Sequence, residues 1–352
     1  MYLYFSFLVA GIFLSVVVIK LRPAFGGKSQ GEILSRIKSS PNFRNGVFQN
    51  PEPTPMFVKD ASMWKTIRQF IHGTENGRPD LVETAVFDKA AFLRTGKGIR
   101  FVWFGHSTLL LNIDGTIILT DPVFSGNASP VPFSNKSFKY SNNNYLPTLP
   151  DIDIMLISHD HYDHLDYKTI KNIHSRVKRF YVPLGVEAHL IRWGVSPDKI
   201  IVADWGNVFT DISGITFTAT PARHFSGRGI ANRNTTLWCS WVILTNSYNL
   251  FYGGDSGYGK HFKEIGNKFG PFDFTMLECG QYNKNWAYIH SFPEQTIQEH
   301  IDIKGKKLLP IHWGKFKLSL HPWDEPISRA SAEAEKKGVD LLNVQIGEVV
   351  TL

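Results

Sequence analysis

The chain has 352 residues, of which 43% are hydrophobic and 20% are charged, enough apolar surface to exclude a fully disordered protein. Its two cysteines, Cys239 and Cys279, exclude a disulfide scaffold and a cysteine-based zinc finger. Lysine and arginine outnumber aspartate and glutamate by 38 to 31, a net charge of +7, but they are scattered. A nucleic-acid-binding protein would concentrate them in a stripe, so we expect no nucleic-acid partner.

The first segment, residues 1–19, contains no charged side chain. As a helix it would be about 30 Å long, close to the thickness of the hydrocarbon core of a bilayer. We therefore predict a membrane anchor over residues 1–22, with a cleaved signal peptide and a buried core helix as the alternatives. Lys20, Arg22 and Lys28 follow the segment and favour a body that faces the cytoplasm, while the periplasmic or exported side stays open.

After the anchor, a mixed leader over residues 23–95 is expected to pack on a main domain over residues 96–352. The leader contains one helical pattern, at 61–71. In the main domain the predicted strands are 100–104, 108–113, 116–119, 154–158, 179–182, 199–202, 215–220, 240–244, 250–252, 274–277 and 307–310. The predicted helices are 167–173, 187–193 and 293–301. This alternation predicts an α/β protein whose sheets are covered by helices.

Two local signals refine these elements. Asp114 and Gly115 lie between two strand patterns and predict a tight hairpin turn. Ser291 and Glu294 predict a capping box at the start of the helix over 293–301.

The segment 158–166, Ser-His-Asp-His-Tyr-Asp-His-Leu-Asp, directly follows an apolar strand. Imidazole and carboxylate groups are ligands for zinc and similar divalent ions. His159 and His161 stand at alternate positions and can converge on one ion, and Asp163 and His164 lie close enough in the turn to bind a second. A solvated polar loop is the alternative, but this density of ligand types after a buried strand is uncommon in such loops.

The spacing His-x-His-x-Asp-His at residues 159–164 resembles the signature of the metallo-β-lactamase superfamily. The resemblance implies the metallo-β-lactamase αββα sandwich, in which two mixed sheets are flanked by helices. It also implies further ligands as isolated residues at strand ends. The candidates in the expected order are His224, Asp255 and His312.

More distant segments are similar to the branch of this superfamily that contains N-acyl-phosphatidylethanolamine-hydrolysing phospholipase D. The similarity covers about residues 45–352. The segments that carry it are 48–54, 105–108, 120–124, 159–166, 237–241, 254–258, 290–294 and 312–316.

The resemblance implies how the ligands divide between two metal ions. His159, His161 and His224 would hold one ion, Asp163, His164 and His312 the other, and Asp255 would bridge the two. We expect zinc, with manganese or iron as alternatives, because the set contains no thiolate. Two such ions lower the pKa of a shared water, and the resulting hydroxide can attack phosphorus.

Two residues outside the ligand set are expected to assist. His290 would stabilise the departing alkoxide, the alternative being that it only caps or packs. Asp121 ends an apolar strand and would orient ligand loops or a ligand imidazole, with simple turn capping as the alternative. We place His106 in the same outer shell.

These features favour a phospholipase D-type phosphodiesterase that releases N-acylethanolamine and phosphatidic acid from N-acyl-phosphatidylethanolamine. Its partner would be a phospholipid at a membrane surface. Another hydrolase of the same fold is the first alternative: a lactonase, a nuclease or a β-lactamase. A non-catalytic metal-binding or interaction protein is the second, and the complete ligand set argues against it. The oligomeric state stays open, with a homodimer among the alternatives.

Overall fold

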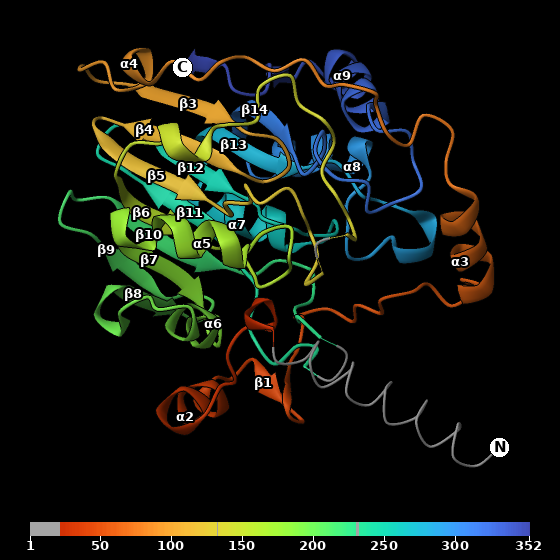
Figure 1. The fold of residues 1–352 in the computed structure, drawn as a ribbon, viewed down its shortest axis with the longest axis horizontal. Coiled ribbons are helices and arrows are strands. Elements are labelled where there is room, and N and C mark those ends of the chain that lie inside the picture. Colours follow the sequence, from red (N-terminus) through yellow and green to blue (C-terminus); the bar gives the residue numbers. More distant parts are fainter. Residues whose placement is uncertain (1–21, 132, 230–231) are drawn as a thin grey trace.

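Two mixed β-sheets packed face to face form the centre of the protein (Figure 1). The computed structural model describes residues 22–131, 133–229 and 232–352. Within these residues the first sheet has the order β16–β3–β4–β5–β6–β7–β8 and the second the order β15–β14–β13–β12–β11–β10–β9. The first sheet comprises β3 (Ile99–Trp103), β4 (Leu109–Ile113), β5 (Thr116–Thr120), β6 (Ile152–Leu156), β7 (Val177–Pro183), β8 (Ile200–Ala203) and β16 (Val349–Thr351). The second comprises β9 (Val208–Thr210), β10 (Thr216–Thr220), β11 (Ser240–Leu244), β12 (Asn249–Tyr252), β13 (Phe272–Glu278), β14 (Gly305–Ile311) and β15 (Asp340–Leu341).

Each sheet is antiparallel at one end and parallel at the other. Strands β16, β3, β4 and β5 pair antiparallel, whereas β5 to β8 run parallel. The second sheet repeats this division, with β9 to β12 antiparallel and β12 to β15 parallel. The predicted hairpin turn is confirmed between β4 and β5, where Asp114 and Gly115 have φ angles of 50° and 96°. These positive values are what a two-residue turn of this hand requires.

Helices connect the parallel strands and cover the outer faces of the sheets, because parallel neighbours need a long crossover. On the first sheet these are α5 (Tyr167–Ile173) and α6 (Glu187–Arg192), and on the second α7 (His261–Phe269), α8 (Pro293–Asp302) and α9 (Glu325–Lys337). Between the sheets, Phe101 packs on Phe274 and Tyr181 on Phe217, with ring centroids 4.9 Å and 4.8 Å apart. A second apolar cluster fills the space between the second sheet and α7, α8 and α9. The predicted αββα sandwich is therefore confirmed.

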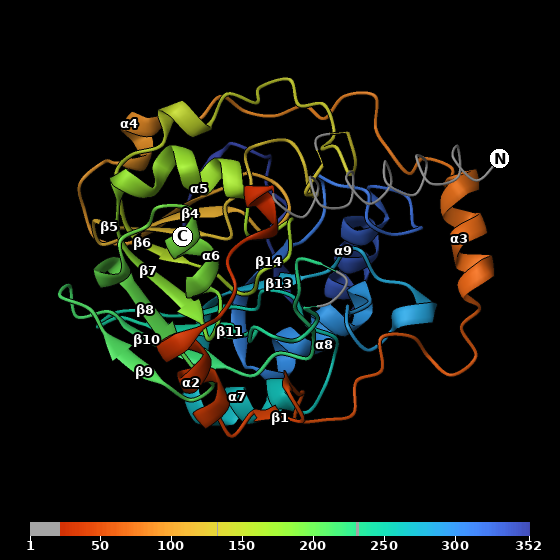
Figure 2. The ribbon, with the colours of Figure 1, turned by 60° about the horizontal axis from the view of Figure 1, so that its bottom comes forward.

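The leader runs along the outside of this sandwich. It contains α2 (Gly31–Ser39), the hairpin of β1 (Phe43–Arg44) and β2 (Val47–Phe48), α3 (Met63–His72) and α4 (Lys89–Phe92). Phe48 is fully buried in a cluster with Ile37, Leu184 and Trp238, which attaches the hairpin to the main domain. Helix α3 stands apart from the sheets in both views (Figures 1 and 2).

The start of α8 differs from the prediction. The helix begins at Pro293, and its capping contact is the Phe292 backbone N–H, which donates to Gln295 Oε1 at 3.0 Å. Ser291 instead turns inward, where its hydroxyl forms hydrogen bonds with the Ser256 carbonyl and with the carboxyl group of Glu299. The predicted capping box of Ser291 and Glu294 is therefore wrong, because the helix starts one residue later than that pairing requires.

The expected membrane association needs a correction. Across the described residues no helix is both long and apolar enough to cross a bilayer. The longest of them, α9, has 13 residues and so spans only about 20 Å. This finding contradicts the membrane-associated localisation expected from the start of the chain. The predicted anchor over residues 1–22 lies outside the described residues apart from Arg22.

Candidate metal centre

The predicted ligands come from loops that follow four strands, at one edge of the sandwich. Residues 158–166 follow β6, and His224, Asp255 and His312 follow β10, β12 and β14. Because the carboxyl ends of parallel strands meet at the same edge of a sheet, these loops converge. The structure brings all seven predicted ligands together.

The first group consists of His159, His161, His224 and Asp255, whose ligand atoms all lie within 4.8 Å of one another. His161 Nδ1 is 2.8 Å from His159 Nε2 and 3.3 Å from His224 Nε2. Asp255 Oδ2 lies 3.8 Å from His159 Nε2 and 3.6 Å from His224 Nε2. Three ring nitrogens and one carboxylate oxygen thus surround one point, as a tetrahedral divalent ion requires.

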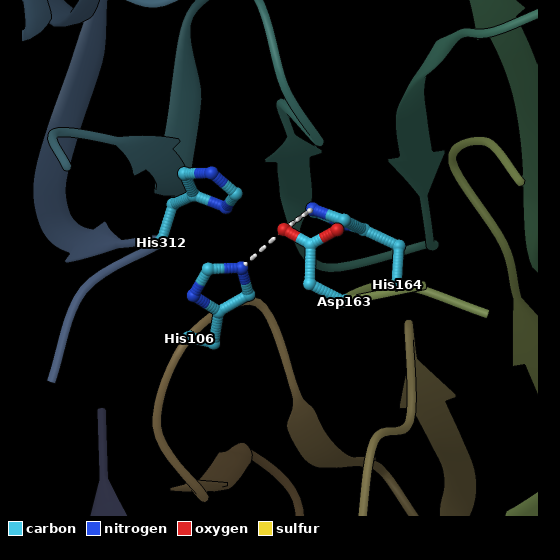
Figure 3. Close-up of side chains that lie close together, drawn as sticks. All are labelled: His106, Asp163, His164 and His312. Atoms are coloured by element: carbon cyan, nitrogen blue, oxygen red, sulfur yellow. Dashed lines mark hydrogen bonds and ion pairs between the residues drawn. The ribbon is translucent and has the colours of Figure 1, made fainter. Parts of the chain in front are cut away.

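The second group consists of Asp163, His164 and His312, joined by His106 (Figure 3). His106 Nε2 donates to Asp163 Oδ2 at 2.8 Å, and His164 Nε2 is 3.5 Å from the same oxygen. His106 has a φ angle of +56°, which holds its fully buried ring toward the group. The sequence placed His106 in an outer shell, and a hydrogen bond to the predicted ligand Asp163 is the contact expected of such a residue.

Asp255 contacts both groups. Its Oδ2 atom is 3.1 Å from His164 Nε2, in addition to its contacts with the first group. Its Oδ1 atom lies 3.0 Å from His312 Nδ1. The carboxylate therefore stands between the two groups, where the sequence predicted a bridging ligand.

Buried lone pairs test whether this set fits metal ions. Within the described residues, His164 Nε2, His312 Nε2 and Asp255 Oδ1 are buried and have no hydrogen-bond partner. Burying such atoms unpaired destabilises a fold, and a cation would satisfy them. Burial also holds the pKa values of His159, His224 and His312 well below the usual range, which favours the neutral form of these rings, the form that coordinates a metal. The residues fit two divalent ions.

The outer nitrogens of three ligand rings are fixed by hydrogen bonds. His224 Nδ1 donates to the Ile289 carbonyl at 2.8 Å, and His159 Nδ1 contacts Ser158 Oγ at 2.9 Å. His164 Nδ1 donates to Asp121 Oδ2 at 2.7 Å. Each bond leaves Nε2 free to face the ions, which is the usual role of an outer-shell partner.

Asp121 is the most heavily bonded carboxylate at the site. Besides His164, it accepts the Ser158 backbone N–H at 2.8 Å, the Ser158 hydroxyl at 2.5 Å and the Tyr252 hydroxyl at 2.6 Å. It follows β5 and is fully buried. The structure thus places Asp121 against both the ligand loop and a ligand imidazole, the position predicted for an orienting residue.

His290 lies beside the two groups without belonging to the predicted ligands. Its ring is 5.0 Å from that of His224 and stacks on His312 at 5.2 Å. Its Nδ1 atom lies 2.7 Å from Glu278 Oε2, within hydrogen-bond distance. The sequence analysis missed Glu278, although its place at the end of a strand pattern is the same signal that revealed the ligands.

A cavity of about 290 Å³ opens over the ligands. Its polar side includes His161, Asp163, Asp255, His290 and His312, and its apolar side includes Met56, Phe57, Phe70, Phe225, Trp286 and Leu318. The leader supplies part of the apolar wall: Phe70 of α3 stacks on Trp286 with ring centroids 6.2 Å apart.

The leader also holds one of the ligand loops. Asn50 Nδ2 donates to the His224 carbonyl at 2.7 Å, and Asn50 Oδ1 accepts the His224 backbone N–H at 3.1 Å. The same oxygen accepts from Trp238 Nε1 at 3.2 Å. One side chain of the leader therefore fixes the backbone of a ligand from both sides.

An αββα sandwich with this ligand set at its edge defines a metal-dependent hydrolase of the metallo-β-lactamase superfamily. The chain belongs to this superfamily: the model of the beta-lactamase superfamily domain matches residues 116–313, more than half of the chain. The resemblance identified from the motifs is confirmed.

Relatives place the chain in the branch of this superfamily that contains N-acyl-phosphatidylethanolamine-hydrolysing phospholipase D. An uncharacterized protein of Mycobacterium tuberculosis is 39% identical over 90% of this chain and 86% of its own length. The N-acyl-phosphatidylethanolamine-hydrolyzing phospholipase D 1 of Caenorhabditis elegans is 30% identical over 72% of this chain and 75% of its own length. Among solved structures, the metallo hydrolase Igni18 of Ignicoccus hospitalis has the same fold, with a TM-score of 0.55 at 20% identity over 73% of this chain and 99% of its own.

Proposed function

We propose that the protein is a phospholipase D-type phosphodiesterase that converts N-acyl-phosphatidylethanolamine to N-acylethanolamine and phosphatidic acid. The observation that carries this proposal is the cavity, which has ligand groups on one side and Met56, Phe57, Phe70 and Trp286 on the other. A substrate with both a phosphodiester and an apolar chain matches these two surfaces. The relative from Caenorhabditis elegans, whose name carries this activity, supports the choice of substrate.

The ligand groups favour a phosphodiester over a neutral amide. Two divalent ions held here would neutralise charge on the phosphoryl oxygens and lower the pKa of a shared water. We propose zinc, with manganese or iron as alternatives, since nitrogen and oxygen donors alone make up the set.

The chain's own residues supply orientation and proton transfer. Asp255 stands between both groups, and Asp121 fixes the ring of His164. His290 lines the cavity and is placed to give a proton to the departing alcohol oxygen.

Product analysis by mass spectrometry tests the proposal with a panel of phospholipids, a lactone and a β-lactam, using Asp255→Asn as the inactive control. We expect N-acyl-phosphatidylethanolamine to yield phosphatidic acid and N-acylethanolamine. In oxygen-18 water the label should enter phosphatidic acid, since the attack is on phosphorus. Label in the alcohol or in a free fatty acid would contradict the mechanism. Turnover of the lactone without turnover of any phospholipid would replace the proposed function by the alternative.

A further inference from the structure

Glu278 is a buried carboxyl group that lies next to the ligand groups and outside the predicted ligand set. It is the last residue of β13 and only 2% exposed. It forms a group with Asp255, His290 and His312, whose ligand atoms lie within 4.8 Å of one another. A carboxyl group that is buried without a hydrogen-bond partner destabilises a protein. We therefore expect Glu278 to have partners close by.

The two oxygens of Glu278 have different partners. Oε1 accepts the backbone N–H groups of Ser256 at 2.8 Å and Ser291 at 3.3 Å. Oε2 lies within hydrogen-bond distance of His290 Nδ1, at 2.7 Å. Backbone donors cannot move without the chain, so Oε1 fixes the carboxyl group. Oε2 then faces the His290 imidazole, with His312 Nε2 farther away at 4.0 Å.

The backbone donors also connect two parts of the site. Ser256 directly follows Asp255, and Ser291 directly follows His290. By binding these two neighbours, the Glu278 carboxylate fixes the distance between Asp255 and His290. A shift of either segment would break a hydrogen bond to the same oxygen.

The ring of His290 needs this restraint because its surroundings are full of ligand atoms. It stacks on His312 at an interplanar angle of 16° and lies against His224. An imidazole released from Glu278 could turn a nitrogen toward the ions and become a ligand itself. Held by Nδ1, the ring presents Nε2 to the cavity.

We propose that Glu278 is the positioning residue for His290: its carboxylate accepts the Nδ1 proton and aims Nε2 at the leaving-group oxygen. The inference rests on the proposed function for the identity of that leaving group. The positioning itself is a property of this chain that can be measured without turnover.

The decisive variant is Glu278→Gln. The amide oxygen can keep the two backbone bonds of Oε1, while the amide N–H₂ replaces Oε2 and donates to Nδ1. The shape of the site is then preserved, but the proton of the imidazole is moved to Nε2. Nitrogen-15 chemical shifts of histidine-labelled, metal-loaded protein report this directly, with the His290 signals assigned by their loss in His290→Gln. In the wild type we expect a protonated Nδ1, so that a second proton on Nε2 makes the imidazolium that can act as the acid. In the variant we expect an unprotonated Nδ1, because it accepts the amide N–H, and the ring is then held as the neutral form, which is a poor acid. A wild-type Nδ1 that carries no proton would overturn the proposal.

Kinetics provide the second readout through the leaving group. p-Nitrophenolate departs without a proton, so bis(p-nitrophenyl) phosphate should be hydrolysed by Glu278→Gln within about threefold of the wild type. On N-acyl-phosphatidylethanolamine, whose leaving alcohol needs a proton, kcat should fall about 100-fold while KM stays within about twofold. Equal losses on both substrates, or a loss of bound metal, would show a merely structural role.

Two further variants keep the test decisive. Glu187→Gln changes another buried glutamate, on α6 and outside the cavity, and should leave both activities unchanged. If Glu278→Gln does not fold, Glu278→Asp is used, whose shorter side chain keeps the charge but moves the carboxylate away from His290. We again expect kcat to fall on the phospholipid and not on bis(p-nitrophenyl) phosphate. If the wild type does not hydrolyse N-acyl-phosphatidylethanolamine, the proposed function fails, and the nitrogen-15 shifts still decide the role of Glu278.

Discussion

Two buried carboxylate–imidazole pairs stand at strand ends, one in each sheet. Asp121 follows β5 of the first sheet and binds His164, while Glu278 ends β13 of the second and binds His290. In both pairs Nδ1 of the imidazole lies 2.7 Å from a carboxyl oxygen. The pairs differ in what Nε2 meets: that of His164 lies 3.1 Å from Asp255 among the ligands, whereas His290 lines the cavity. The same arrangement can therefore serve a ligand in one sheet and a proton carrier in the other.

The largest effect is expected from Asp255→Ala, which removes the residue that both pairs face. Because this carboxylate contacts both ligand groups, its loss should lower the metal content from about two ions to fewer than one and abolish turnover. Elemental analysis after purification in metal-replete buffer measures the content. Retention of two ions with full activity would show that Asp255 does not bridge.

His290→Ala tests whether the Glu278–His290 pair serves turnover and not metal binding. We expect both ions to remain bound, since His290 is outside the predicted ligand set, while kcat on the phospholipid falls by about 100-fold or more. Single-turnover rates and elemental analysis measure the two quantities. His300→Ala, a buried histidine on α8 away from the cavity, is the matched control. Loss of an ion in His290→Ala but not in the control would make His290 a ligand.

Asp121→Asn tests the other pair, and here we expect weaker ion binding as the main effect, whereas His290→Ala should keep both ions bound. The ring of His164 loses its fixed tautomer, so we expect affinity for the ion to fall about 10- to 100-fold. Competition with a chelator measures this affinity. Asp153→Asn, on β6 of the same sheet, should not change it. Unchanged affinity in Asp121→Asn, with reduced kcat alone, would contradict the difference drawn between the two pairs.

The smallest effect is expected from Tyr252→Phe, which removes one of the four donors to Asp121. Since three donors remain, we expect a loss of about 1 kcal/mol, or less than about fivefold in ion affinity. The same chelator competition applies. A loss as large as that of Asp121→Asn would mean that Tyr252, rather than the backbone of Ser158, orients the carboxylate.

The difference between the pairs also explains which parts of the site the sequence revealed. Four ligand candidates lie within residues 159–164, so their pattern is visible without any fold. The Asp121–His164 contact joins residues 43 positions apart and the Glu278–His290 contact residues 12 apart. Asp121 was found because the resemblance marked its segment. The segment that contains Glu278 was not among those similar to the family, and its contact with His290 is visible only in the folded structure.

The fold could be predicted where a short apolar run forms a strand that is buried on both faces, as in β4 and β5. All the strands predicted from residue 98 onward are present, most with boundaries shifted by one or two residues. Helix α9 was missed because it packs through small residues such as Ala330 and Ala334, which leave little apolar periodicity. Strand β16 was missed because three residues carry no pattern of their own, and its pairing with β3 defines it.

The contact between Asn50 and His224 has a consequence for anyone who shortens this chain. A fragment designed on the family match alone would start at residue 116 and lack β3, β4 and His106. A fragment that starts at residue 96 would keep every ligand, yet the His224 backbone and the Trp238 indole would lose a shared partner. The smallest useful expression unit therefore includes the hairpin of β1 and β2, because a segment that contributes no ligand still sets the position of one.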